Sequence, residues 1–154
     1  MANVAEQTVT VFGESWVSQG LKNLEVASQS PTIVRLKDAF VGKTLVAVVA
    51  GPSLDKNIET IKELRGKVVI YSVTHAVQAL LKHDIVPDII AAVDPEELNY
   101  HLFNQKVEKS FAVLGITVSQ DVWKMPFRGK FVMPVNMAYD SWVFSLFGPT
   151  PCLS

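Results

Sequence analysis

The sequence predicts an α/β protein with a Rossmann-like, three-layer αβα arrangement, built on a mostly parallel sheet of about five strands. Short apolar runs rich in β-branched residues alternate with segments of helical periodicity from residue 43 onward. Parallel strands need a crossover connection, which is usually a helix, so this alternation favours a parallel sheet. The first run is continuously apolar rather than alternating, which is typical of a strand buried on both faces.

A short helical lead-in is expected before the sheet. Val17, Leu21 and Leu24 recur at helical spacing. Ser15 precedes them and is a candidate N-cap. These residues therefore predict a first helix in the lead-in.

A second helical pattern follows in the same lead-in. Ile33, Leu36 and Phe40 recur at i, i+3 and i+7. Pro31 stands at a plausible first helical position, where its missing N–H costs nothing. Gly42 is expected to end this segment.

The sheet region reads as strands and helices in alternation. The apolar runs expected to form strands are residues 44–50, 67–73, 88–93, 110–116 and 130–135. The segments expected to form helices are residues 54–66, 76–82, 96–107 and 138–147. Right-handed crossovers would place these helices on the faces of the sheet.

Two parts are expected along the chain: the lead-in of residues 1–42 and a Rossmann-like nucleotide-binding domain of residues 43–154. The chain ends at GPTPCLS, directly after the apolar aromatic segment WVFSLFG. We therefore expect the domain to be truncated at its C-terminus. The apolar end favours contact with a missing C-terminal portion or a homo-oligomer.

Composition excludes several classes of protein. Fourteen basic and 15 acidic residues give a formal net charge of -1, which is not the footprint of a nucleic-acid-binding protein. The single cysteine, Cys152, cannot form an internal disulfide or a cysteine-based zinc site. No apolar run approaches the ~20 residues that cross a bilayer, and the N-terminus does not resemble a signal peptide. We expect a cytoplasmic protein without membrane or nucleic-acid partners.

Candidate ligand-binding residues follow from one rule of open α/β sheets, which bind ligands beyond the carboxyl ends of their strands. The loops at those ends contain Gly51, Pro52, Ser53, Leu54, Ser72, Thr74, His75, Asp94, Gly115, Thr117 and Asn136. All but His75 and Asp94 are candidates for binding a nucleotide.

The loop after the first strand is the sharpest of these signals. Gly51 permits a tight turn, and Pro52 suits the start of a helix. The N–H groups of Ser53, Leu54 and Asp55 are expected to be unpaired donors at the positive end of the helix dipole. Such a helix terminus is an anion site. The alternative is an ordinary strand-to-helix turn in which Ser53 is a cap.

Two titratable residues are candidates for catalysis. Asp94 follows a buried strand, where a carboxylate can bind Mg²⁺, a ribose hydroxyl or an acceptor; the alternative is a turn-forming Asp-Pro. His75 follows the second strand and is a candidate general acid, base or phosphate ligand; the alternative is a helix-start residue without a role. Glu96 and Glu97 are expected to be solvated.

The residues of the first loop and third strand resemble a known family. The strings VVAGPSLDKNIETIKEL and LLKHDIVPDIIAAVDP are similar to the shared domain of the motility-associated-factor (Maf) flagellin glycosyltransferases. The resemblance covers residues 15–154 and is most specific over 51–58 and 85–95. It implies transfer of a nonulosonic acid, of the pseudaminic or sialic acid type, from a CMP-activated donor to flagellin Ser or Thr.

Two relatives of that family carry the same core signature. One is the archaeal 6-hydroxymethyl-dihydropterin diphosphokinase, a related family with MptE-like members that uses Mg²⁺ with ATP. The other is the bacterial sialyltransferase group, in which an Asn-Gly-Pro-Ser-Leu turn meets the CMP donor. This chain has Ala50 where that group has the Asn, so a side-chain amide contact is missing.

Three functions follow from the residues and the resemblance together. The first is the Maf-type transferase, which needs no cofactor, with Asp94 or His75 as base and flagellin as acceptor. The second is a Mg-ATP-dependent diphosphokinase, in which Asp94 holds the metal. The third is a non-catalytic nucleotide-binding or assembly module. A residue beyond Ser154 is an equal candidate for the base, so the chain by itself is expected to lack part of the site.

Overall fold

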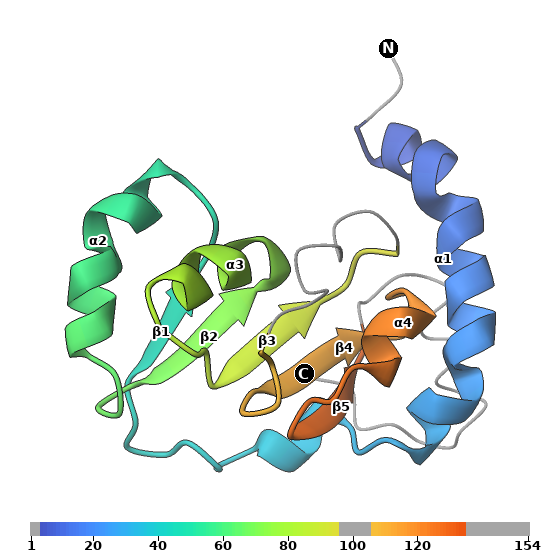
Figure 1. Cartoon of the computed structure of the whole chain (residues 1–154). Helices are drawn as coiled ribbons and strands as arrows, with labels where there is room; N and C mark the ends of the chain where they lie inside the picture. The colour runs from blue at the N-terminus through green and yellow to red at the C-terminus, as the bar shows by residue number, and fades with distance from the viewer. Residues whose placement is uncertain (1–3, 96–105, 135–154) are drawn as a thin grey trace.

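The computed structural model describes residues 4–95 and 106–134, and it contains a five-stranded sheet (Figure 1). All neighbouring strands are parallel, and their order in the sheet is the order of the chain. The strands are β1 (Leu45–Val48), β2 (Val69–Val73), β3 (Ile89–Ala92), β4 (Phe111–Gly115) and β5 (Gly129–Met133). The predicted α/β class, with a parallel sheet of about five strands after a helical lead-in, is confirmed.

Four α-helices and one 3-10 helix accompany the sheet. They are α1 (Val4–Gln29), η1 (Ile33–Leu36), α2 (Pro52–Glu63), α3 (Thr74–Lys82) and α4 (Gln120–Lys124). Each crossover advances by one strand in the same direction, and right-handed crossovers of that kind place their helices on one face. The helix predicted over 138–147 lies outside the described residues. Of the helix predicted over 96–107, only residues 106 and 107 are described, and these two are not helical.

The helix-covered face holds most of the hydrophobic core. The stripe of Leu54, Ile58 and Ile61 on α2 is buried as the sequence predicted, and it packs with Val48 of β1. Toward the other end of the sheet, a second cluster joins the strands to α3, α4 and α1. Burial of this kind contributes about 1.5–3 kcal/mol for each large apolar side chain, which holds the helices against the sheet.

The opposite face is covered by the short segment that follows α1. Ile33, Leu36 and Phe40 pack against the middle strands. The helix predicted there is only one 3-10 turn, because the Val132 N–H donates to the Pro31 carbonyl at 2.9 Å and holds the chain extended beside β5. The apolar positions were right, and the regular helix was wrong.

Helix α1 is longer than the sequence pattern indicated, and it buries a different face. Ser15 lies in its interior, so the predicted N-cap was wrong. Val17 and Leu21 are exposed, whereas Asn23 and Ala27 are buried. Figure 1 shows α1 at the β5 side of the sheet, where it packs against α4. Among the helices of residues 4–95 and 106–134, none is long and apolar enough to cross a membrane.

Strand β1 lies at the edge of the sheet and is buried on one face only. Val48 is buried against α2, but Leu45 and Val49 are 50% and 61% exposed. The prediction of burial on both faces was wrong because the segment that covers the second face packs against β2, β3 and β4 and not against the edge strand β1. A continuous apolar run does not tell a central strand from an edge strand.

Candidate functional site

The strand register brings the predicted loops to one edge of the sheet. Val48 of β1 lies beside Ser72 of β2, and Ser72 lies beside Ile90 of β3. Gly115 of β4 similarly lies beside Met133 of β5. Since all strands point the same way, the segments that follow them meet at the carboxyl edge, where α/β proteins bind their ligands.

The order of the strands separates two of the predicted residues. β2 lies between β1 and β3, so the loop of Ser53 and the loop of Asp94 are two strands apart. At the usual strand spacing this is roughly 10 Å. His75 follows β2 and therefore belongs to the strand between them. A ligand that reaches both Ser53 and Asp94 must extend across the end of β2.

Helix α2 has Gly51 as N-cap and Pro52 as first residue, so it begins at the proline that the sequence marked as a suitable helix start, two residues before the expected span of 54–66. Of the three predicted N–H donors, Leu54 is already paired, because it donates to the Gly51 carbonyl at 2.9 Å. The Gly51 carbonyl also lies four residues before Asp55, so it is the regular helical acceptor for the Asp55 N–H. Ser53 has no intrahelical acceptor, since the corresponding carbonyl lies before the helix. The predicted set of donors therefore reduces to the Ser53 N–H, aided by the helix dipole.

Gly51 has an extended backbone, with φ 166° and ψ 167°, which any residue can adopt. The sequence suggested that Gly51 permits a tight turn, but the backbone at this residue is extended instead. A Cβ built at Gly51 would meet no protein atom within 4 Å. The space in front of this residue is open, so a side chain there would obstruct a bound ligand rather than the described part of the protein.

The neighbouring residues anchor and line this helix start. The Leu54 side chain is buried in the core, so it anchors α2 rather than reaching a ligand. Asn57 is exposed, and its Nδ2 donates to the Ser53 carbonyl at 2.7 Å. Ser53, Asn57 and Thr60 line a cavity of about 290 Å³ between α2 and β1. This open cavity lies alongside the proposed anion site.

At the end of β2, the hydroxyls are largely engaged within the protein. Ser72 is fully buried, and its Oγ donates to the Val73 carbonyl at 3.1 Å. Thr74 is also buried, with its Oγ1 3.4 Å from Nδ1 of His75. His75 itself is half-buried on the first turn of α3. The structure therefore places Ser72 below the edge and His75 closer to its surface.

The end of β3 is held by a residue from the next loop. The Oγ1 of buried Thr117 donates to the Val93 carbonyl at 2.7 Å, directly before half-buried Asp94. Gly115 ends β4 just before this loop. Thr117 thus positions the backbone beside Asp94.

Asn23 also positions this edge, and the sequence pattern did not single it out for that role. The side chain is fully buried on α1, and its Nδ2 donates to the carbonyls of Ile116 at 2.8 Å and Val118 at 2.6 Å. These bonds tie the lead-in helix to the loop that carries Thr117. A polar residue inside an apolar helix face is a sequence signal that could have indicated it.

The predicted site residue Asn136 lies outside the part of the chain that the structure describes, as do Glu96 and Glu97, which were expected to be solvated. Within the described part, no group of three or more His, Cys, Asp or Glu side chains could hold a metal ion. Asp94 would thus supply one oxygen toward Mg²⁺, and other ligands would have to come from phosphate, water or other residues.

The fold and edge together define a class: a Rossmann-like α/β protein with a Gly-Pro-Ser helix start and an aspartate at its carboxyl edge. The family profile described as "6-hydroxymethylpterin diphosphokinase MptE-like" matches residues 18–149. The chain therefore belongs to the MptE-like family.

Two relatives set this membership in context. The solved structure of the MAf glycosyltransferase from Magnetospirillum magneticum AMB-1 is 26% identical, with a TM-score of 0.57, over 70% of this chain and 17% of that one. An uncharacterized protein of Treponema pallidum (strain Nichols) is 29% identical over 93 residues, which are 58% of this chain and 41% of that one. The chain spans less than half the length of either relative.

Proposed function

We propose that this chain is the nucleotide-sugar-binding part of a glycosyltransferase, and that the start of α2 holds the phosphate of the donor. The observation that carries the proposal is the Ser53 N–H at a helix start with open space at Gly51. The similarity to the MAf glycosyltransferase supports it, because 26% identity accompanies the shared fold. The finer proposal is a CMP-activated nonulosonic acid as donor and a flagellin Ser or Thr as acceptor.

The chemistry asks for charge stabilisation at the phosphate. The bond between the anomeric carbon and the phosphate oxygen breaks, and CMP leaves with the bonding electrons. An acceptor hydroxyl forms the new bond to that carbon and gives its proton to a base. The Ser53 N–H and the dipole of α2 would stabilise the charge that grows on the leaving phosphate.

The base must lie on the acceptor side of the sugar. His75 follows the strand next to β1, and Asp94 follows the strand beyond it. A donor phosphate at Ser53 with its sugar extending across the end of β2 would bring the anomeric carbon toward these residues. We propose one of the two as the base, because imidazole and carboxylate side chains are among the groups that most often act as general bases.

A second candidate function is transfer of diphosphate from Mg-ATP to a pterin alcohol. The description of the matching family favours it, and Asp94 is the residue that would contact the metal. The same helix start would then hold an ATP phosphate. The two candidates differ in nucleotide and in their need for Mg²⁺.

One titration separates them. The complete protein is titrated by calorimetry with CMP, CTP, ADP and ATP, each with and without Mg²⁺. The transferase predicts metal-independent preference for the cytidine nucleotides, whereas the kinase predicts ATP binding that needs Mg²⁺. Failure of every nucleotide to bind would reject both and favour the assembly module.

A further inference from the structure

The amino edge of the sheet, opposite the candidate nucleotide site, contains a second cavity. It encloses about 290 Å³ where β2, β3 and β4 begin. Apolar side chains of Phe40, Val69, Ile89 and Phe111 form part of its lining. A cavity of this kind accommodates the apolar body of a small molecule.

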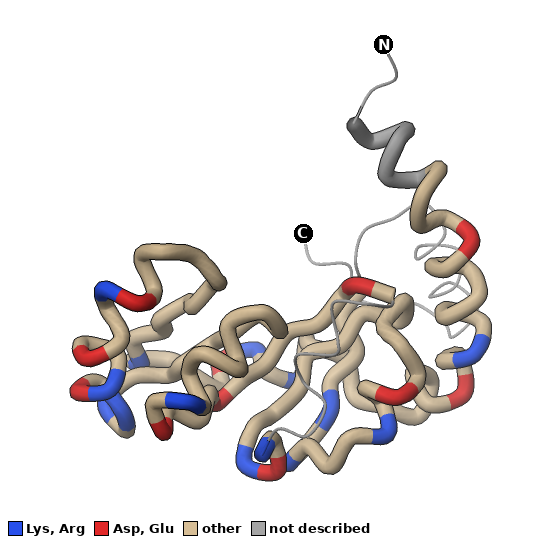
Figure 2. The backbone as a smooth tube through the Cα atoms, turned by 45° about the horizontal axis from the view of Figure 1, so that its top comes forward, with Lys and Arg blue, Asp and Glu red and all other residues tan. Residues whose placement is uncertain are grey.

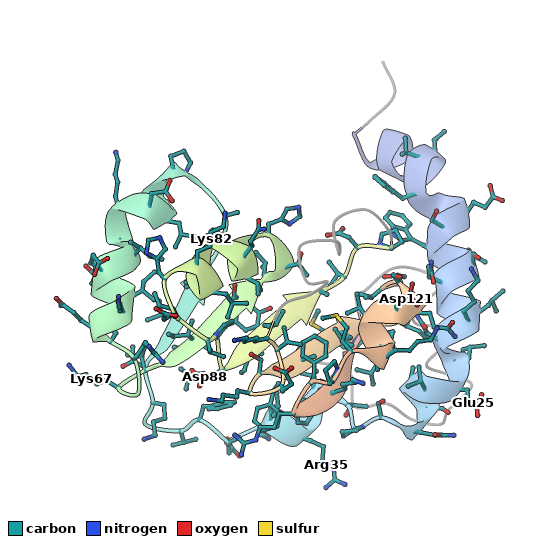
Figure 3. The ribbon with its side chains drawn as sticks, in the orientation of Figure 1. Glu25, Arg35, Lys67, Lys82, Asp88 and Asp121 are labelled. Atoms are coloured by element: carbon teal, nitrogen blue, oxygen red, sulfur yellow. The ribbon has the colours of Figure 1, made fainter. Side chains whose placement is uncertain are left out.

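Four cationic side chains line the same cavity. They are Lys43, Lys67, Lys109 and Arg128, and each precedes a different strand. Figure 2 shows Lys and Arg positions, in blue, on several separate stretches of the backbone. Figure 3 shows Lys67 and Asp88 at the end of the sheet where the strands begin. The fold, rather than a local run of sequence, gathers these charges.

The backbone that carries these cations is held in place. Lys67 follows a turn at Gly66, whose φ of +74° favours glycine, and its N–H donates to the Leu64 carbonyl at 2.9 Å. The Arg128 N–H donates to the Ser110 carbonyl at 3.0 Å, and its guanidinium lies 4.8 Å from the centre of the Phe111 ring. That cation–π contact joins a charge to the apolar wall.

The positive charge is not balanced within the cavity. Asp88 is the acidic residue of the lining, and its Oδ2 accepts a hydrogen bond from the Ile70 N–H at 2.8 Å. Within residues 4–95 and 106–134, the ion pair present joins Lys124 and Asp121 at the exposed face of α4. None of the four cavity cations therefore forms an ion pair with a described residue. The lining therefore has four cations against one carboxylate.

We propose that this cavity binds a small organic anion, with a phosphate or carboxylate among the four cations and an apolar body against Phe40 and Phe111. The proposal is independent of the nucleotide site, because the two lie at opposite edges of the sheet. A purely apolar ligand would leave the cations unused, and an inorganic anion would leave the apolar wall unused.

The test titrates the full chain with phenyl phosphate, benzoate, inorganic phosphate and phenol. Binding of each probe is detected by changes in the amide chemical shifts of the protein. Phenyl phosphate or benzoate should shift the signals of Lys67, Asp88 and Phe111, and its affinity should fall as salt rises. A preference between those two probes identifies phosphate or carboxylate as the anionic group. Inorganic phosphate and phenol should bind at least about tenfold more weakly, since each lacks one half of the recognition.

The matched variants are Lys67→Gln with Lys109→Gln, and Lys56→Gln with Lys62→Gln on the exposed side of α2. The first pair should weaken the preferred probe about tenfold or more, and the second should leave its affinity unchanged. The proposal would be overturned if both pairs of variants lost affinity equally, or if phenol or inorganic phosphate bound as tightly as the preferred probe. Chemical-shift changes confined to the edge of the sheet near Ser53 would also overturn it. Thermal unfolding of each variant identifies any loss that comes from misfolding, and Lys43→Gln then repeats the comparison.

Discussion

Thr117 joins the ends of two neighbouring strands, because its Oγ1 donates to the Val93 carbonyl at 2.7 Å. The bond connects the loop after β4 to the residue directly before Asp94. Its acceptor and donor are 24 residues apart in the sequence. The position of Asp94 therefore depends on a side chain from a different crossover.

Replacing Thr117 with Val keeps the shape of the side chain and removes that donor. The part-buried Val93 carbonyl is left without this partner, which should cost about 1 kcal/mol of unfolding free energy, measured by urea denaturation. Nucleotide affinity should also fall, because the backbone at Asp94 is no longer held.

Ser110→Ala is the matched control for that substitution. Ser110 is buried, and its Oγ donates to the Pro87 carbonyl at 2.7 Å at the amino edge of the sheet. Its loss should lower stability by a similar amount without changing nucleotide affinity. An equal fall of affinity in both variants would show that Thr117 acts through stability alone.

Asn23→Asp should be a strongly destabilising change although it is conservative in size. It replaces the Nδ2 donor of two hydrogen bonds with a carboxylate oxygen facing the carbonyls of Ile116 and Val118. Burial would raise the pKa of the new carboxyl group above its value in the unfolded chain. The variant should therefore lose several kcal/mol at neutral pH and recover part of it as the pH falls, when the group is protonated.

Urea unfolding of Asn23→Asp and the wild type at pH ~7 and ~5 measures this difference. The gap between the two proteins should narrow at the lower pH. A gap that stays constant would show that the Nδ2 bonds do not hold the loop after β4.

Burial raises the pKa of the Tyr71 hydroxyl above its ordinary value. The folded chain therefore keeps this proton at a pH at which the unfolded chain has begun to lose it. The resulting stability is present below pH ~10 and is lost as the pH rises through the folded-state value. Tyr71→Phe removes this dependence. Between pH ~8 and ~11, the unfolding free energy of the wild type should fall more steeply than that of Tyr71→Phe. Parallel curves for the two proteins would contradict a raised pKa of the Tyr71 hydroxyl.

Local patterns in the sequence predicted α2 well. Leu54, Ile58 and Ile61 lie on one face of this helix at helical spacing. Pro52 is its first residue, and Gly66 lies in the turn that follows it. These signals act within a few residues of one another. The carboxyl-edge loops followed in turn, because a parallel sheet places all such loops at one edge.

Features that depend on distant partners could not be predicted in that way. Val49 is exposed because the segment that covers this face of the sheet packs against β2, β3 and β4, which the sequence around Val49 does not reveal. Asn23 is buried against the loop after β4, where its two carbonyl acceptors lie 93 and 95 residues away in the sequence. The roughly 10 Å between the loops of Ser53 and Asp94 likewise follows from β2 lying between them.

The helix start at Gly51 is tested most directly by a pair of glycine substitutions. Gly51→Ala adds a methyl group that meets no protein atom, on extended backbone that alanine can adopt. Gly42→Ala also enters open space, but its φ of +74° strains a side chain. The first variant should keep the wild-type stability, and the second should lose about 1 kcal/mol.

The decisive measurement is the affinity of the complete protein for CMP, by calorimetry, in the wild type and these two variants. We expect Gly51→Ala to weaken binding about tenfold or more, because the methyl group obstructs the donor phosphate, whereas Gly42→Ala should leave it unchanged. Equal CMP affinity in Gly51→Ala and the wild type would contradict a phosphate at the start of α2.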